Sequence, residues 1–219
     1  MDDIQATLQM ISIAFIPVVF AIVLHEIAHG WVAKQLGDNT AYSQGRLSLN
    51  PIKHIDPIGT LVVPILLYTT VGFAFGWAKP VPISWRNLGN PKRDMVYVAL
   101  AGPVANLLMT VFWSIVLKIV SLLPQGFGSM IEPLALMASI GIGVNILLML
   151  FNLLPLPPLD GGRVAVGLLP PKPAYYLSRL EPFGIIIILG LLVTGVLGSI
   201  ISPIIQLVFQ LIGVLAGIQ

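Results

Sequence analysis

The sequence contains no cysteine and very few charged residues. Without a thiol among its 219 residues, disulfide bridges and thiolate zinc sites are excluded. Charged side chains make up 9% of the chain, whereas soluble domains contain about 25%. The hydrophobic fraction is 57%, and the net charge of +2 is too small to indicate binding to nucleic acid. This composition predicts an integral membrane protein in which histidine and carboxylate must bind any metal.

The uncharged apolar segments are long and do not alternate, which favours transmembrane helices over barrel strands. We therefore expect an all-α polytopic membrane protein, with a bundle of about five to six transmembrane helices in one domain over residues 1–219. Its core would cover residues 8–165, and the C-terminal helices at 182–217 would form one or two spans. The apolar runs lie at about 8–33, 57–77, 95–123, 134–154 and 182 onward.

Basic residues are concentrated on one predicted side of the membrane. The link 123–132 contains no lysine or arginine. Because basic residues favour the cytoplasmic side, we expect that link outside the cell and the basic stretches inside. Both ends of the 57–77 run would then be cytoplasmic, which predicts a re-entrant segment instead of a full span. Ten of the eleven basic residues lie at 34–53, 79–93 and 163–179.

The cytoplasmic stretch after the first apolar run is polar and rich in turn residues. Residues 42–49 within it predict a short strand or β-hairpin. The chain as a whole is expected to be a multi-pass protein of the plasma membrane, with its active site toward the cytoplasmic side.

A metal-binding pattern lies inside the first apolar run. His25 and His29 are one helical turn apart on the same face, which is the spacing that lets two imidazoles bind one zinc ion. Glu26 lies beside them and is free to act as a base toward a metal-bound water. A chance match is the alternative, but polar side chains in hydrocarbon are costly without compensation. The pattern therefore predicts one Zn²⁺ with a bound water.

A catalytic zinc ion normally has three protein ligands, so one ligand remains to be found. Asp160 is the best candidate, because it follows an apolar helix in a proline-broken turn closed by two glycines. The alternative is that Asp160 only caps this turn, as aspartate commonly does. The other candidates are His54, Asp56, Asp94 and Glu181.

Two asparagines lie within the apolar runs. Asn106 and Asn152 could each donate a hydrogen bond to a substrate carbonyl or a developing oxyanion. Bonding to a neighbouring helix is the alternative for both, and it is the usual role of asparagine within membranes. We treat both as candidate substrate-binding residues.

Three motifs resemble the site-2 protease family of intramembrane zinc metalloproteases. They are HEIAHG at 25–30, GPVAN at 102–106 and NLLPLPPLDGG at 152–162. The resemblance implies that His25, His29 and Asp160 hold zinc and that Glu26 activates water. It also implies that Asn152 positions the substrate backbone. The chain contains neither a PDZ insert nor a cystathionine-synthase-type domain, so it resembles the compact prokaryotic subgroup.

The function expected from these residues is hydrolysis of peptide bonds in transmembrane substrates. The partners would be a transmembrane protein or peptide and the lipid bilayer, with no nucleic acid and with the oligomeric state open. A zinc transporter or sensor without hydrolytic activity is the alternative. Transporters often contain internal repeats, which this chain lacks, and a transport site has no need of a general base such as Glu26.

Overall fold

A computed structural model describes residues 2–71, 76–124 and 127–216 of the chain. Parts of three predicted segments lie outside the described residues. They are 72–75 of the 57–77 run, 125–126 of the 123–132 link, and 217 at the end of the C-terminal helices. Every regular element in the described ranges is a helix. The longest are α1 (Asp2–Gln35), α4 (Pro91–Ser121), α5 (Gly128–Asn152) and α9 (Val196–Ala216). The shorter ones are α2 (Thr40–Ser43), α3 (Val63–Val71), α6 (Asp160–Leu168), α7 (Pro171–Ser178) and α8 (Gly184–Val193), with the short turns η1 (Pro51–His54), η2 (Pro57–Val62), η3 (Trp85–Asn87) and η5 (Glu181–Phe183).

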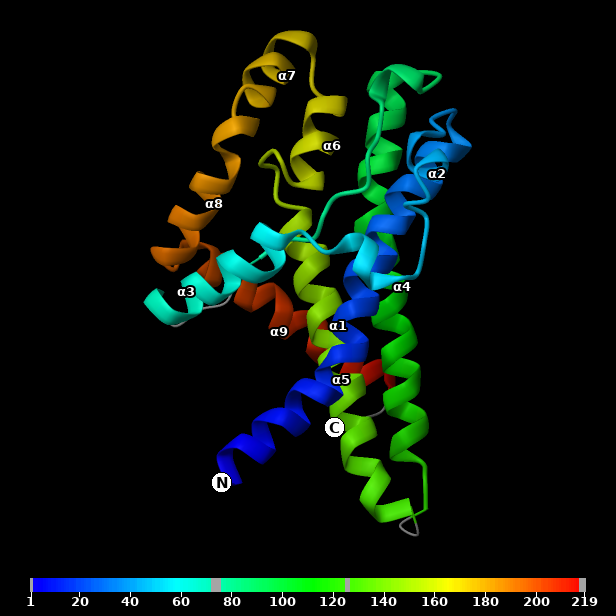
Figure 1. Ribbon diagram of the computed structural model, residues 1–219, viewed down its shortest axis with the longest axis vertical. Coiled ribbons are helices and arrows are strands. Elements are labelled where there is room, and N and C mark those ends of the chain that lie inside the picture. Colours follow the sequence, from blue (N-terminus) through cyan, green and yellow to red (C-terminus); the bar gives the residue numbers. More distant parts are fainter. Residues whose placement is uncertain (1, 72–75, 125–126, 217–219) are drawn as a thin grey trace.

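Helices α1, α4 and α5 form the centre of the molecule, and α6 packs against α4. In Figure 1, α4 and α5 run side by side in opposite directions, and α1 lies against both. Side chains such as Ile142, Ile146 and Trp113 are buried between these helices. Others, such as Leu108 and Phe112, are apolar yet exposed. Helices that are apolar on all sides are typical of contact with lipid.

Helix α1 changes direction within its length, as Figure 1 shows. Pro17 lies inside this helix, is almost fully buried, and cannot donate the backbone hydrogen bond of a regular turn. The bend separates the N-terminal half of the helix from the half that carries His25 and His29.

Among the described residues, four helical segments are long and apolar enough to cross a membrane: Ile4–Gln35, Pro91–Ser121, Met130–Asn152 and Pro171–Val193. An all-helical, multi-pass membrane protein is therefore confirmed. The predicted count of five to six spans is not supported by the described residues, because a span needs about 20 apolar residues. The remaining apolar stretches are shorter than that: Pro57–Leu67, and Val196–Leu211 within α9.

The C-terminal part differs in its boundaries from the expectation. Its candidate span begins at Pro171, before residue 182 where the C-terminal helices were expected to begin. Helices α8 and α9 are separated at Gly195, whose φ of +75° is in the left-handed region that favours glycine. Pro203 lies within α9.

The β-hairpin predicted at residues 42–49 is wrong, since the described part of the chain contains no strand. Tyr42 and Ser43 belong to α2, which follows a turn held by the Asp38 carboxylate. Gly45 then adopts φ +62° and reverses the chain. The Arg46 side chain, and not a backbone ladder, connects this segment to the carbonyls of Lys79 and Pro80. Side-chain hydrogen bonds have replaced strand pairing here.

The two ends of the 57–77 run are joined by hydrogen bonds. The Trp77 N–H donates to the Gly59 carbonyl over 3.0 Å, and the Thr60 hydroxyl donates to the Trp77 carbonyl over 2.9 Å. Helix α3, nine residues long, lies between these two points. The two ends of the run are therefore neighbours.

Candidate metal centre

Three donor atoms from α1 and α6 meet in one buried cluster. The Nε2 atoms of His25 and His29 are 3.1 Å apart, and each is 3.2 Å from Asp160 Oδ2. All three residues are buried. An ion held tetrahedrally at about 2.0–2.1 Å from its ligands requires ligand atoms about 3.3 Å apart. The triangle has the size that zinc requires.

The opposite nitrogen of each imidazole contacts α4. His25 Nδ1 lies 2.5 Å from Asn106 Oδ1, and His29 Nδ1 lies 2.7 Å from the Val98 carbonyl oxygen. A carbonyl oxygen can only accept, so both Nδ1 atoms carry the hydrogen in these contacts. Both Nε2 atoms then point lone pairs at the Asp160 carboxylate. This is the tautomer that a histidine needs in order to bind a metal through Nε2.

The residues of the cluster fit a cation. Three acceptor atoms face one another without a hydrogen between them, and Asp160 Oδ2 has no hydrogen-bond partner among the described residues. A buried carboxylate oxygen in that position is costly unless a positive charge compensates it. Two neutral imidazoles and one carboxylate are a donor set that Zn²⁺ accepts.

The backbone before Asp160 explains how this residue reaches the histidines. Helix α5 ends at Asn152, an irregular stretch follows, and α6 begins at Asp160. A Cβ on Gly161 would lie 2.2 Å from the Leu153 carbonyl oxygen, and one on Gly162 would lie 2.2 Å from the Pro157 nitrogen. The two glycines therefore allow the chain to fold back closely enough to direct Asp160 into the bundle.

Glu26 is half-buried beside the cluster and does not belong to it. Its Oε2 accepts a hydrogen bond of 2.7 Å from the Val81 N–H. This donor lies 55 residues away in the non-helical segment that follows α3. The Glu26 carboxylate is thus held by the Val81 N–H and is not one of the three clustered residues.

The four alternative third ligands are engaged elsewhere. His54 Nε2 contacts the Ser48 carbonyl at 2.9 Å, and Asp56 accepts from the backbone N–H groups at the start of η2. Asp94 accepts from the Asn90 N–H and the Arg93 side chain at the start of α4. Glu181 is exposed and lies 3.8 Å from Arg163. None of them is in the cluster of three.

The two predicted asparagines have different surroundings. Asn106 is fully buried, and its amide donates to the Ala21 carbonyl and to Asn145 Oδ1 while its oxygen faces His25. Asn152 is half-buried at the end of α5, where its amide donates to the Leu148 carbonyl of the same helix. Asn106 therefore contacts a candidate ligand, and Asn152 does not.

Sequence reasoning missed two residues next to the site. Asn145 is fully buried on α5; it accepts from Asn106 and donates to the Gly141 carbonyl. A Cβ on Gly102 would lie 2.4 Å from His29 Nε2 and 2.5 Å from His25 Cε1. An uncharged amide in the middle of an apolar run is a signal that could have identified Asn145, but it was not used. Gly102, four residues before Asn106, carried no separate signal.

Known proteins resemble this chain over most of its length. The protein of Bacillus subtilis provisionally named zinc metalloprotease YwhC is 38% identical over 203 residues, which cover 90% of this chain and 87% of the relative. The protein of Mycolicibacterium smegmatis provisionally named zinc metalloprotease Rip2 is 29% identical, covering 87% and 70%. Its Mycobacterium tuberculosis counterpart is 25% identical with the same coverage.

No family model and no solved structure matches the chain. The relative in B. subtilis nevertheless exceeds one third identity across nearly the whole of both proteins. The motifs HEIAHG, GPVAN and NLLPLPPLDGG lie on the three helical regions that meet at the cluster. The chain belongs to the site-2 protease family of zinc metalloproteases.

Proposed function

We propose that the chain hydrolyses peptide bonds of transmembrane substrates at the cluster of His25, His29 and Asp160. The observation that carries this proposal is that a metal-binding cluster and the separate carboxylate of Glu26 occur together. Three unprotonated donor atoms face one another, and Glu26 stands beside them with a carboxylate that is not consumed by the cluster. A site that only binds zinc would need the three clustered ligands but not Glu26.

The residues have separate roles in the proposed reaction. Zn²⁺ held by the three ligands would supply a Lewis acid, which lowers the pKa of a bound water and polarises a carbonyl. Glu26 accepts the proton of the attacking water and later delivers it to the leaving amine. Asn106 keeps His25 in the required tautomer through its oxygen. Asn152 donates a hydrogen bond to the substrate backbone, for which its amide must leave the Leu148 carbonyl.

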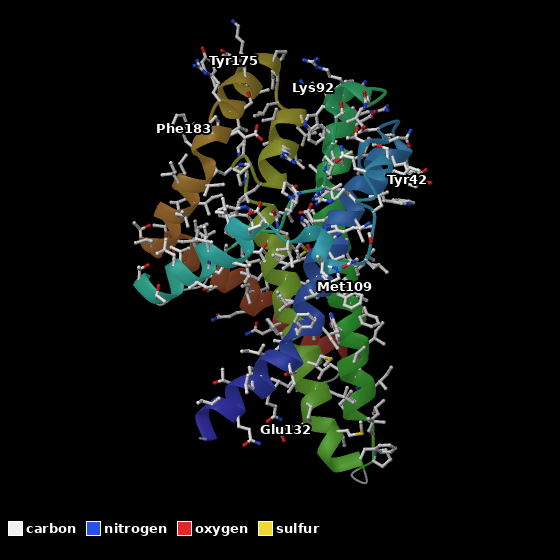
Figure 2. All side chains as sticks on the ribbon, in the orientation of Figure 1. Tyr42, Lys92, Met109, Glu132, Tyr175 and Phe183 are labelled. Atoms are coloured by element: carbon white, nitrogen blue, oxygen red, sulfur yellow. The ribbon has the colours of Figure 1, made fainter. Side chains whose placement is uncertain are left out.

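We further propose that residues 1–219 act as one domain with the site on the cytoplasmic side. Figure 2 has Lys92 on α4 and Tyr175 on α7 near one end of the long axis, and Glu132 on α5 near the other. The basic end is the cytoplasmic end according to the positive-inside rule. Water would reach the site from that side.

The 57–77 segment is proposed as a re-entrant loop beside the substrate. The hydrogen bond between Trp77 and Gly59 supports this. Because the two ends of the run are adjacent, they lie on the same side of the membrane, and the run cannot be a single membrane span. Exposed apolar side chains on the described part, such as Ile58, Ile65 and Leu66, would contact lipid or a substrate helix.

The test is Glu26→Gln in the purified full-length protein in liposomes. A panel of single-span reporter proteins serves as substrate, and zinc content is measured on the same samples. We expect one zinc per chain in both proteins and cleavage by the wild type alone. Cleavage by the variant at the wild-type rate would overturn the assignment. Zinc flux into the vesicles that persists in the variant would instead support a transporter.

A further inference from the structure

The segment at residues 76–84, here called the strap, crosses the site without regular secondary structure. It connects the returning end of the 57–77 run to η3. Along its length, backbone N–H groups donate to other segments in succession. Lys79 donates to the His54 carbonyl over 2.9 Å, Val81 to Glu26 over 2.7 Å, and Ser84 to Asp38 Oδ2 over 2.7 Å. The strap therefore lies between the cytoplasmic turns and α1.

Val81 donates a backbone hydrogen bond to Glu26, and neither of its immediate neighbours could do so. Pro80 and Pro82 flank it, and proline has no N–H. Val81 is buried, with 5% of its surface exposed, whereas Pro80 is exposed. One N–H is thus presented to the carboxylate, and a shift of the strap by one residue would present none.

The strap is held in place independently of Glu26. Arg46 Nη2 donates to the Lys79 carbonyl over 2.9 Å and contacts the Pro80 carbonyl at 3.3 Å. On the other side, Gly30 of α1 allows close approach, because a Cβ there would lie 2.8 Å from Val81 Cγ1. The contacts from Arg46 fix the position of the strap along α1, and the contact with Gly30 fixes how closely Val81 approaches this helix.

We propose that Val81 is a positioning residue for Glu26 and acts through its backbone N–H. A glutamate side chain has three rotatable bonds, and a half-buried carboxylate beside a cation site has several orientations available. A charge-assisted hydrogen bond to one oxygen restricts Glu26 to a single orientation and leaves the other oxygen for the water proton. This inference rests on the proposed function, because it concerns the base of that reaction.

The direct test replaces the Val81 amide by an ester, Val81→2-hydroxyisovalerate, which removes the N–H and leaves the side chain unchanged. We expect kcat toward the reporter proteins to fall about 10-fold or more, since small misplacements of a catalytic group are costly. KM and zinc content should remain at wild-type values, because neither the ligands nor the substrate contacts change. An unchanged kcat would overturn the proposal.

A pair of ordinary variants keeps the proposal testable if the ester protein does not fold. Arg46→Met removes the side chain that holds the strap, and Lys53→Met removes a nearby basic side chain whose Nζ donates to Gly45 instead. We expect a reduced kcat with full zinc content for the first and no change for the second. Equal kcat values would contradict the strap's role. If the wild type cleaves none of the reporter proteins, the proposed function fails before this comparison is reached.

Discussion

The two sides of the site are built from different kinds of structure. The candidate ligands come from helices, and the imidazoles are oriented by two buried residues of helix α4, through the Asn106 side chain and the Val98 carbonyl. Glu26 comes from the same α1 but is oriented by a strap without regular structure, through the Val81 N–H. The first side is enclosed by packed helices, and the second is joined to turns at the surface.

This difference indicates that metal binding and base orientation can be separated by mutation. Changes on the helical side should remove zinc and, with it, cleavage. Changes on the strap side should leave zinc in place and reduce turnover. The variants below test whether zinc binding and turnover can be changed separately.

The largest effect is expected for Asp160→Ala, which removes one of three ligand atoms. Two imidazoles remain, and the zinc content should fall from about one equivalent to a small fraction, with cleavage lost. Metal analysis of the purified protein measures this directly. Asp56→Ala is the matched control, because this carboxylate caps η2 and should keep full zinc. Zinc retained by the Asp160 variant would remove this residue from the proposed site.

Gly102→Ala is expected to have the next largest effect. Alanine is a better helix former than glycine, yet its Cβ would lie 2.4 Å from His29 Nε2 and force the imidazoles apart. We expect zinc affinity to fall about 10- to 100-fold, as for other changes that reorient ligands. Gly190→Ala in α8 is the control, since nothing lies within 4 Å of the added atom. Equal affinities in competition with a chelator would contradict the packing argument.

Removing the amide that faces His25 should have a moderate effect. Asn106→Leu leaves the imidazole without its acceptor, and a loss of zinc affinity of about 10-fold is expected. Asn145→Leu, which removes a partner of Asn106, should give a smaller loss of the same kind. Asn152→Leu should keep zinc affinity unchanged and raise KM. Loss of zinc in the Asn152 variant and not in the other two would reverse these assignments.

The smallest effect concerns Asp38, which holds the far end of the strap. Burial would raise its pKa, but hydrogen bonds from Thr40, Asn87 and Ser84 outweigh this and lower it. A lowered pKa means that the carboxylate stabilises the fold above its unfolded pKa of about 3.9 and that this contribution is lost as the pH falls further. Asp38→Asn should therefore melt below the wild type at pH 7.

Thermal unfolding in detergent at several pH values tests this expectation. The difference in Tm between the two proteins should shrink progressively once the pH drops below about 4. A constant difference across the whole range would show that the Asp38 charge is not what stabilises the turn. Zinc content should be the same in both proteins, because Asp38 lies on the strap side of the site.

Much of the helical side could be predicted from the sequence. The interval of four between His25 and His29 determines a shared helix face, and a carboxylate in an apolar setting needs a partner. The charge distribution predicted that the basic stretches at 34–53 and 163–179, which follow His29 and Asp160, lie on the same side of the membrane. The structure brings these three residues together, and the remaining candidates for a third ligand have other partners.

The strap side could not be predicted in the same way. Its donor is a backbone N–H, which every residue except proline has, so no residue type marks Val81. The turn residues near Gly45 predicted a hairpin, but Asp38 and Arg46 hold this part of the chain through side chains. The close approach of Gly102 to the histidines depends on how α1 crosses α4, which neither helix specifies alone.

The junction of Gly59 and Trp77 has a consequence for replacing the segment between them. The two ends of the intervening segment meet at one point, and the Trp77 ring leaves only 2.2 Å for a Cβ on Gly59. A segment joined in this way can be replaced as a unit, because both of its ends are at the same place. Doubling the length of such a loop costs only about 0.6 kcal/mol in chain entropy, and the helices that carry the ligands need not move. Chimaeras exchanged at this junction should therefore retain zinc while acquiring the substrate range of the donor protein.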